Sequence, residues 1–388
     1  MKRVELFLIF FRIGATAFGG PAAHIAMMED EFVRRRAWVT RERFLDLLGA
    51  ANLIPGPTST ELALLIGMER AGWMGLLLAG AGFILPAFAL VTIIAAFCAA
   101  GGATPAFESV MRGIQPVILA IVLQALFNLS KTAFKTRLLI LCAALVAAGA
   151  IFDLNVLVLL LAAGISNALY NTLKSPVASV TSSVALFGAL IFGKRSFFPP
   201  PQRAGGQPIP DASMVAQSVP AVTVLLSFLK IGAFYYGGGY VLLAFLREEF
   251  VEKNLISEKQ LMTAIAVGQF TPGPLFTSAT FIGYQLQGVS GAVAATVGIF
   301  APAFLYAALS GLFVPRIRKS PLAGEFLDGV NAASCALMAI VTAQLSGNAV
   351  VDWKTALIGL ISAVVLIRFK INATWLVLAG AAIGWLCL

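Results

Sequence analysis

The stretch Leu53-Ile54-Pro55-Gly56-Pro57 in the first half of the chain is matched by Phe270-Thr271-Pro272-Gly273-Pro274 in the second half. The two prolines of each stretch lack a backbone donor, and the glycine between them allows a sharp turn, so both stretches predict a broken helix. Exposed to lipid, such backbone would leave polar groups unsatisfied. We therefore expect both Pro-Gly-Pro turns to face protein or a water-filled cavity, as a broken helix pair or a re-entrant hairpin.

The similarity of the two halves extends well beyond these turns. Before the turns, residues pair at a spacing of 218, which matches Arg12 with Lys230. At the turns the spacing is 217, which matches Asn52 with Gln269, and further on it is 216. An internal repeat with interrupted hydrophobic segments is the sequence signature of a secondary transporter.

The composition places the chain in a membrane. Of its 388 residues, 59% are hydrophobic and 12% are charged, and residues 73–100 carry no charge. A soluble core cannot hide so much apolar surface, so we predict an all-α, polytopic membrane protein. Arg12 interrupts the first apolar stretch, and we expect the chain to be inserted by its own helices without a cleaved signal peptide. The four cysteines lie in apolar stretches and there is one histidine, so we expect no disulfide framework, metal site or cofactor.

The apolar segments form two comparable sets. We assign residues 1–192 to a first transmembrane half, the Pro- and Gly-rich residues 193–216 to an exposed linker, and residues 217–388 to a second transmembrane half. We expect apolar segments near residues 4–28, 44–68, 73–100, 109–129, 138–152, 154–173, 176–192, 217–246, 259–284, 289–314, 324–347, 352–368 and 371–388.

Loops rich in arginine and lysine in one half match loops with few basic residues, or with balancing acids, in the other half. Residues 34–43 contain five arginines, whereas the equivalent loop of the second half balances its basic residues with glutamates. After the third segment of each half the bias is reversed. By the positive-inside rule the halves lie in opposite orientations, as an inverted-topology repeat, with chance in small charge counts as the alternative. These loops account for the net charge of +9, and we expect no nucleic-acid partner.

The helices that restart after the Pro-Gly-Pro turns could bind an anion. Free amide groups and the positive end of the helix dipole would point into the membrane there, next to hydroxyl groups. Brought together near the midplane, two such ends could hold a tetrahedral dianion such as chromate or sulfate. The alternative is a proline kink whose hydroxyl groups only cap the helix. The candidate residues are Gly56, Thr58, Ser59 and Thr60 in the first half and Gly273, Thr277 and Ser278 in the second.

Arg12 and Lys230 occupy matching places inside otherwise apolar segments. A cation there costs about 2.5–3.5 kcal/mol on insertion scales. We interpret both as cationic partners of an anion, with snorkelling toward the membrane surface as the alternative for Arg12. Backbone and amide groups complete the candidate substrate site, with close helix packing as the alternative for the glycines. These residues are Gly19, Gly20, Asn52, Gly237, Gly238 and Gln269.

Glu61 and His24 are the candidate proton carriers of the first half. Glu61 lies one turn into the restarted helix, where it either exchanges protons with the substrate or caps the backbone amides, and we favour the cap. Glu31 and Glu249 begin hydrophilic loops, so we expect them to be solvated. The chain has no nucleotide-binding Gly-x-x-x-x-Gly-Lys-Ser/Thr loop, so an ion gradient or the membrane potential must drive transport.

The chain resembles the chromate ion transporter family in its long, two-domain form. The resemblance covers nearly the whole chain outside the linker, and it implies export of chromate across the bacterial inner membrane, with sulfate as a similar anion. In many members glutamine stands where this chain has Glu61, and an acid there could alter coupling or substrate. The motifs that carry the resemblance are Phe11-Arg12-Ile13-Gly14, Gly19-Gly20-Pro21 with His24, residues 52–61, Lys230-Ile231-Gly232, Gly237-Gly238-Gly239 and residues 268–276.

Two alternatives stay open beside chromate export. The first is transport of another anion such as sulfate, inward or outward. The second is a membrane-embedded enzyme acting on a lipid phosphate, which would cluster acids or histidine at a membrane face. The acids of this chain are scattered or lie in basic loops, which favours the transporter. The sequence leaves a homodimer open.

Overall fold

Each Pro-Gly-Pro turn separates two helices. In the first half, α3 (Arg41–Ala51) ends before the turn and α4 (Thr58–Phe97) begins directly after it. In the second half, α12 (Glu258–Phe270) is followed by a short 3-10 turn, η4 (Leu275–Thr277), and then by α13 (Ser278–Arg318). The glycines at the centre have φ values of +142° and +99°, which favour glycine. The predicted broken helices are therefore confirmed in both halves.

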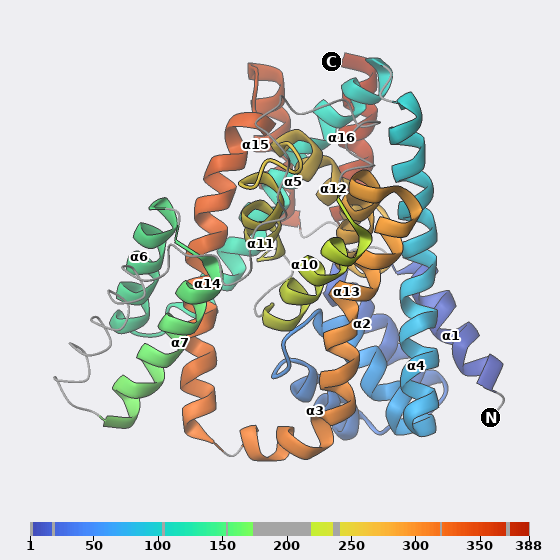
Figure 1. The fold of residues 1–388 in the computed structure, drawn as a ribbon, viewed down its shortest axis with the longest axis vertical. Coiled ribbons are helices and arrows are strands. Elements are labelled where there is room, and N and C mark those ends of the chain that lie inside the picture. Colours follow the sequence, from blue (N-terminus) through green and yellow to red (C-terminus); the bar gives the residue numbers. More distant parts are fainter. Residues whose placement is uncertain are drawn as a thin grey trace.

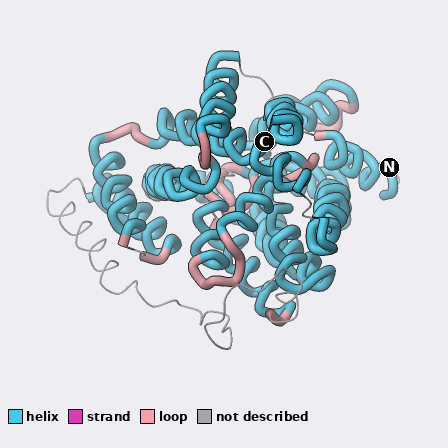
Figure 2. Tube along the Cα trace, turned by 90° about the horizontal axis from the view of Figure 1, so that it is seen from above, coloured by secondary structure: helices cyan, strands magenta, loops and turns pink. Residues whose placement is uncertain are grey.

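The computed structural model describes residues 3–17, 20–102, 105–152, 154–173, 219–235, 241–318, 320–369 and 373–387 (Figure 1). The prediction of an all-α fold is confirmed, and in the view from above no strand is drawn among the described residues (Figure 2). The remaining elements are α1 (Arg3–Thr16), α2 (Gly20–Glu29), η1 (Asp30–Arg35), η2 (Cys98–Gly102), α5 (Pro105–Ala133), α6 (Arg137–Ile151), α7 (Val156–Leu173), α10 (Ala221–Phe234), α11 (Leu242–Leu246), η3 (Arg247–Val251), α14 (Pro321–Ala349), α15 (Trp353–Phe369) and α16 (Ala373–Cys387).

Four helical stretches of the described chain are long and apolar enough to cross a membrane: Thr58–Ala100, Ser109–Lys131, Leu275–Ser310 and Pro321–Gly347. Shorter apolar helices accompany them. The predicted segment 176–192 and the predicted linker 193–216 lie outside the described residues. The boundaries drawn at these positions stay predictions.

The helices α4 and α13 each fold back on themselves. Gly67 and Gly75 are in close backbone contact, although a straight helix would separate residues eight apart by about 12 Å. The chain reverses between them at Gly72, which has a φ of +59°, and Gly288 repeats this reversal with a φ of +60°. Each Pro-Gly-Pro turn thus joins two short helices, and a long helix follows the second one.

The long pieces of α4 and α13 run in opposite directions in Figure 1. By their colours, residue numbers increase upward along α4 and downward along α13. An inverted-topology repeat requires this relation. The inverted topology itself stays a prediction, because no membrane fixes the orientation of either half.

The two halves interlock. Helix α5 of the first half packs against α15 and α16 of the second half, and α14 of the second half packs against α6 and α7 of the first. Backbones approach closely at both contacts, where Gly113 meets Gly380 and Gly329 meets Ala163. Small residues allow such packing between membrane helices.

Candidate functional site

The two Pro-Gly-Pro turns each contact the long helix of the opposite half. A Cβ added to Gly56 would lie 3.5 Å from the Cβ of Ala303 in α13. A Cβ added to Gly273 would lie 2.7 Å from the Cβ of Ala87 in α4. Ala87 and Ala303 match at a spacing of 216, and each directly follows a proline inside its helix. Since α4 and α13 also pack against each other, each turn lies against this crossing of the two helices.

A polar connection joins the two turns through α2. Nδ1 of His24 lies 3.1 Å from Oγ of Ser59, in the first turn of α4. Nε2 of His24 lies 3.1 Å from the carbonyl oxygen of Ala17, at the end of α1. The same carbonyl accepts a hydrogen bond from the backbone N–H of Gly273, at 3.2 Å. His24 is fully buried, with its ring edge-on to Phe83 at 5.3 Å between centroids.

Glu61 is buried without a polar partner. Both of its carboxylate oxygens and the hydroxyl of Thr60 lack a hydrogen bond from any described residue. One oxygen lies against Gly56, where any Cβ would collide with it, so the glycine makes room for the acid. The expectation that Glu61 caps the helix is wrong. The residue at the cap position of α4 is Pro57, no side chain caps this end, and the backbone N–H of Glu61 donates to the carbonyl of Pro57.

The second turn uses its hydroxyl groups internally. Thr277 Oγ1 donates to the carbonyl of Pro274 at 2.9 Å, and Ser278 Oγ donates to the carbonyl of Leu275 at 2.9 Å. Beside them, Nε2 of Gln269 is buried without a partner among the described residues. The hydroxyl groups of Thr277 and Ser278 are therefore not free to donate a hydrogen bond to an anion in this structure.

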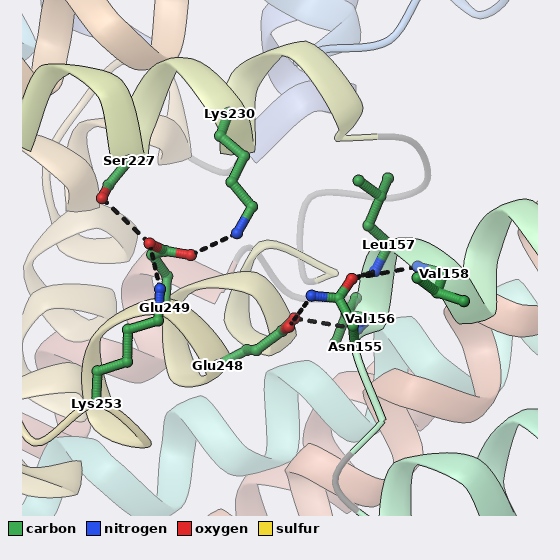
Figure 3. A network of polar contacts seen from close by, with 9 residues as sticks. All are labelled: Asn155, Val156, Leu157, Val158, Ser227, Lys230, Glu248, Glu249 and Lys253. Carbon is green, nitrogen blue, oxygen red and sulfur yellow. Dashed lines mark hydrogen bonds and ion pairs between the residues drawn. The ribbon is translucent and has the colours of Figure 1, made fainter. Parts of the chain in front are cut away.

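Arg12 and Lys230 both pair with a buried glutamate. Arg12 lies 2.6 Å from Glu31. Lys230 lies 2.7 Å from Glu249, as Figure 3 shows. The expectation that both glutamates are solvated is wrong, because they are 6% and 5% exposed. Glu31 lies in the π-helical turn η1 and Glu249 in η3. A second cation that follows the same turn pairs with each glutamate, Arg36 and Lys253, at 2.6 Å each.

The two glutamates stay charged because their cations outweigh burial. Burial raises the pKa of the Glu31 carboxyl, but the hydrogen bond and charge of Arg36 and the charge of Arg12 lower it below its usual value. The pKa of Glu249 is lowered in the same way, by Lys230 and Lys253 against burial. The pairs differ in exposure, since the side chain of Arg12 is 55% exposed and that of Lys230 is 15% exposed.

A third glutamate links the halves. Glu248 in η3 accepts hydrogen bonds from Asn155 Nδ2 at 2.7 Å and from the backbone N–H of Val156, the first residue of α7, at 3.1 Å (Figure 3). Burial raises the pKa of its carboxyl to about 7. Sequence patterns gave no sign of this contact between residues 93 positions apart.

The structure brings together some of the predicted site residues and separates others. Gly56, Ser59, Thr60, Glu61, His24 and Gly273 gather at the helix crossing, with Thr277, Ser278 and Gln269 on the second turn. Thr58 begins α4, Asn52 ends α3, and Gly20 begins α2 with a φ of +76°. Arg12 and Lys230 instead point to Glu31 and Glu249. Gly19, Gly237 and Gly238 lie outside the described residues.

Sequence reasoning missed Glu31 and Glu249 as partners of the buried cations. The signal was present, since Arg12 to Glu31 and Lys230 to Glu249 are both separations of 19 residues. A separation repeated in both halves, with an acid and a base at its ends, would have identified the two ion pairs.

Comparison with known proteins agrees with the repeat. The model of the chromate transporter family matches residues 4–168 and again residues 222–385. The chain is 30% identical to a chromate transport protein of Cupriavidus metallidurans, over 98% of this chain and 91% of that protein. It is 29% identical to a chromate transport protein of Pseudomonas aeruginosa, over 100% of this chain and 92% of that protein. It is 27% identical to a probable chromate transport protein of Synechococcus elongatus, over 92% of this chain and 88% of that protein.

No solved structure matches the chain. The family model covers most of the sequence in two successive regions, and these regions contain the two Pro-Gly-Pro turns. The apolar helices make it a multi-pass membrane protein. The chain belongs to the chromate transporter family.

Proposed function

We propose that this protein exports chromate across the bacterial inner membrane as a secondary transporter. Similarity over almost the full length to proteins named for chromate transport supports the substrate. The observation that carries the mechanism is that each Pro-Gly-Pro turn lies against the long helix of the opposite half, where α4 and α13 cross. Broken helices around a central site are the arrangement that secondary transporters use to bind an ion within the membrane.

The proposed substrate site lies at the start of α4 and beside the second turn. The positive end of the α4 dipole and the hydroxyl of Thr60 would meet the anion there. Ser59, Thr60 and Glu61 are at most 2% exposed, so this structure corresponds to a closed state. Arg12 and Lys230 would add positive charge to this site only after leaving Glu31 and Glu249, with which they pair here.

The membrane potential supplies the driving force for export. A dianion leaving a negative interior gains about 4.6 kcal/mol at 100 mV, since each charge contributes about 2.3 kcal/mol. Glu61 and His24 provide a route for coupling export to protons, in addition to the driving force of the membrane potential. Glu61 is suited to the role because its carboxylate has no partner among the described residues and must neutralise or find one when the site rearranges.

Chromate accumulation in everted membrane vesicles tests the proposal. Vesicles that contain the protein should accumulate chromate when an inside-positive potential is imposed, and excess sulfate should reduce the accumulation if the site selects tetrahedral dianions. Vesicles with the same amount of the Gly56→Ala variant serve as control. Accumulation that does not respond to the potential, or no accumulation at all, would contradict export of a dianion. Accumulation of sulfate but not chromate would favour the alternative substrate.

A further inference from the structure

The single histidine of the chain has both ring nitrogens engaged. The carbonyl oxygen of Ala17 can only accept, so Nε2 of His24 must carry the hydrogen that faces it. A neutral imidazole then has no hydrogen on Nδ1. Nδ1 is therefore an acceptor, and the only hydrogen of the Ser59 hydroxyl is directed at it. In this state Ser59 has no hydrogen left to donate to an anion at the start of α4.

We propose that a proton on His24 switches Ser59 from a donor to histidine into a donor to the transported anion. The proton binds at Nδ1, which becomes a donor to the Ser59 oxygen, and Nε2 keeps its hydrogen bond to Ala17. The hydroxyl hydrogen of Ser59 is then free to turn toward the anion, and the imidazolium adds a positive charge beside it. This role deepens the proposed function and rests on it. His24 acts here as a positioning residue, because it reaches the anion only through Ser59.

The surroundings of His24 suit a proton that binds together with an anion. Its polar and ring contacts among the described residues are with Ala17, which follows α1, and with Ser59 and the Phe83 ring of α4, and none of these residues is charged. Among the acids and bases of these elements, Arg12 of α1 is paired with Glu31, and Glu61 of α4 lies against Gly56. Among the described residues, an imidazolium in this buried place has no fixed counter-ion, so an arriving anion would supply one.

The switch also reaches the second Pro-Gly-Pro turn. The carbonyl of Ala17 is shared by His24 Nε2 and the backbone N–H of Gly273. A protonated imidazole donates a stronger, charge-assisted hydrogen bond to this carbonyl, which also accepts from Gly273. The second half has no matching device, because Leu242 and Phe276 stand where the first half has His24 and Ser59. Proton and anion binding are thus coupled on one side of the repeat.

The coupling has a definite sign. Because the anion favours protonated His24, protonated His24 favours the anion by the same factor. Chromate affinity should rise as the pH falls through the titration of His24, by at most about tenfold per pH unit, the limit for one coupled proton. The variant His24→Gln keeps an amide donor for Ala17 and an oxygen acceptor for Ser59, so it mimics the neutral imidazole and should bind chromate weakly with a flattened pH dependence.

Nitrogen NMR of the protein labelled with 15N-histidine tests the geometry without transport. One imidazole is present, so one pair of ring resonances reports its tautomer. We expect the hydrogen on Nε2 at high pH, and Ser59→Ala should shift the Nδ1 resonance while leaving the Nε2 hydrogen in place. A hydrogen on Nδ1, or an Nδ1 resonance unchanged in Ser59→Ala, would overturn the assignment of donor and acceptor.

Proton uptake on chromate binding tests the coupling. In weakly buffered solution, the detergent-solubilised protein should take up protons when chromate is added. The variant His24→Gln should bind chromate without taking up the proton that His24 binds in the wild type. The two proteins are compared at the same pH, so protonation of chromate itself cancels. Equal uptake in both proteins would overturn the coupling. Chromate binding by neither protein would refute the proposed function and the coupling with it, while the NMR result would still decide the tautomer.

Discussion

The two Pro-Gly-Pro turns share a backbone and differ in their side chains. Both place a glycine at positive φ against an alanine of the opposite half. In the first turn, buried polar groups of Thr60 and Glu61 have no partner among the described residues. In the second turn, Thr277 donates to its own backbone. The repeat thus fixes the shape of the site twice, but the hydroxyl groups after the second turn bond to their own backbone, whereas Thr60 and Glu61 after the first turn have no such partner within the described chain.

Aromatic packing replaces the polar contacts in the second half. Tyr235 and Phe276 stand where the first half has Ala17 and Ser59, and their rings meet edge-on with 4.6 Å between centroids. This contact holds the second turn in place as the His24 contacts hold the first. An internal repeat therefore need not give two equal binding elements, because one copy can serve as scaffold while the other carries the chemistry.

The largest expected effect tests what the turns share. Gly56→Ala would drive a Cβ into the Glu61 carboxylate, and Gly273→Ala would place one 2.7 Å from Ala87. Both also force an alanine into positive φ, which costs about 1–3 kcal/mol. We expect each to reduce chromate transport in vesicles more than tenfold. Gly72→Ala, with positive φ but no atom within 4 Å of the added Cβ, is the control for strain alone and should retain more transport.

The matched ion pairs should respond unequally to loss of their cation. Lys230 is 15% exposed and Arg12 is 55% exposed, so Lys230→Gln should destabilise the protein by up to about 3–5 kcal/mol and Arg12→Gln by about 0–1 kcal/mol. Thermal unfolding in detergent measures both. The double variant Lys230→Gln with Glu249→Gln should recover only part of this stability, because it removes the buried carboxylate but leaves Lys253 without its partner. Equal losses in both halves would contradict the difference in burial.

The acid of the first turn should determine the pH dependence of transport. Glu61→Gln removes a titratable group from the α4 start, whereas Ser278→Ala removes only a hydroxyl that serves its own backbone. We expect Glu61→Gln to change the pH profile of chromate accumulation and Ser278→Ala to keep it. Identical profiles for wild type and Glu61→Gln would remove Glu61 from proton coupling.

A smaller effect concerns the contact between the halves at Glu248. Because burial raises the pKa of its carboxyl to about 7, the folded protein keeps this proton where the unfolded chain has lost it. The folded state therefore loses stability as the pH rises from about 4.5 to about 7. We expect the melting temperature of the wild type to fall by a few degrees over this window and that of Glu248→Gln to fall less. Parallel curves would contradict the raised pKa.

Much of the fold could be predicted because glycine and proline residues occur at matching positions in the two halves. The broken helices, the polar first turn and the breaks between segments 44–68 and 73–100 and between 259–284 and 289–314 follow from residue type, whereas the chain reversals at Gly72 and Gly288 emerged only from the structure. The inverted topology rests on loop charges, and the opposite course of α4 and α13 in Figure 1 is what it requires. Cysteine labelling of the loops from each side of the membrane would decide it.

The ion pairs and the state of Glu61 could not be predicted from local patterns. The sequence predicts that Glu31 and Glu249 lie in water, because they begin polar loops. In the structure, ion pairs with Arg12 and Lys230 of preceding helices stabilise both glutamates in buried positions. Glu61 was expected to cap α4 by its position, but Pro57 occupies the cap and the acid lies against Gly56. Long-range contacts decide both cases.

The most direct measurement of the asymmetry compares Thr60→Val with Thr277→Val. The two threonines match at a spacing of 217, both are fully buried, and the substitutions are close in shape. Thr60 has no partner for its hydroxyl among the described residues, so Thr60→Val should raise thermal stability and reduce chromate accumulation. Thr277→Val removes a hydrogen bond to Pro274, so it should lower stability by about 0.5–1.5 kcal/mol and retain accumulation. Equal losses of accumulation in both variants would contradict a site carried by the first half.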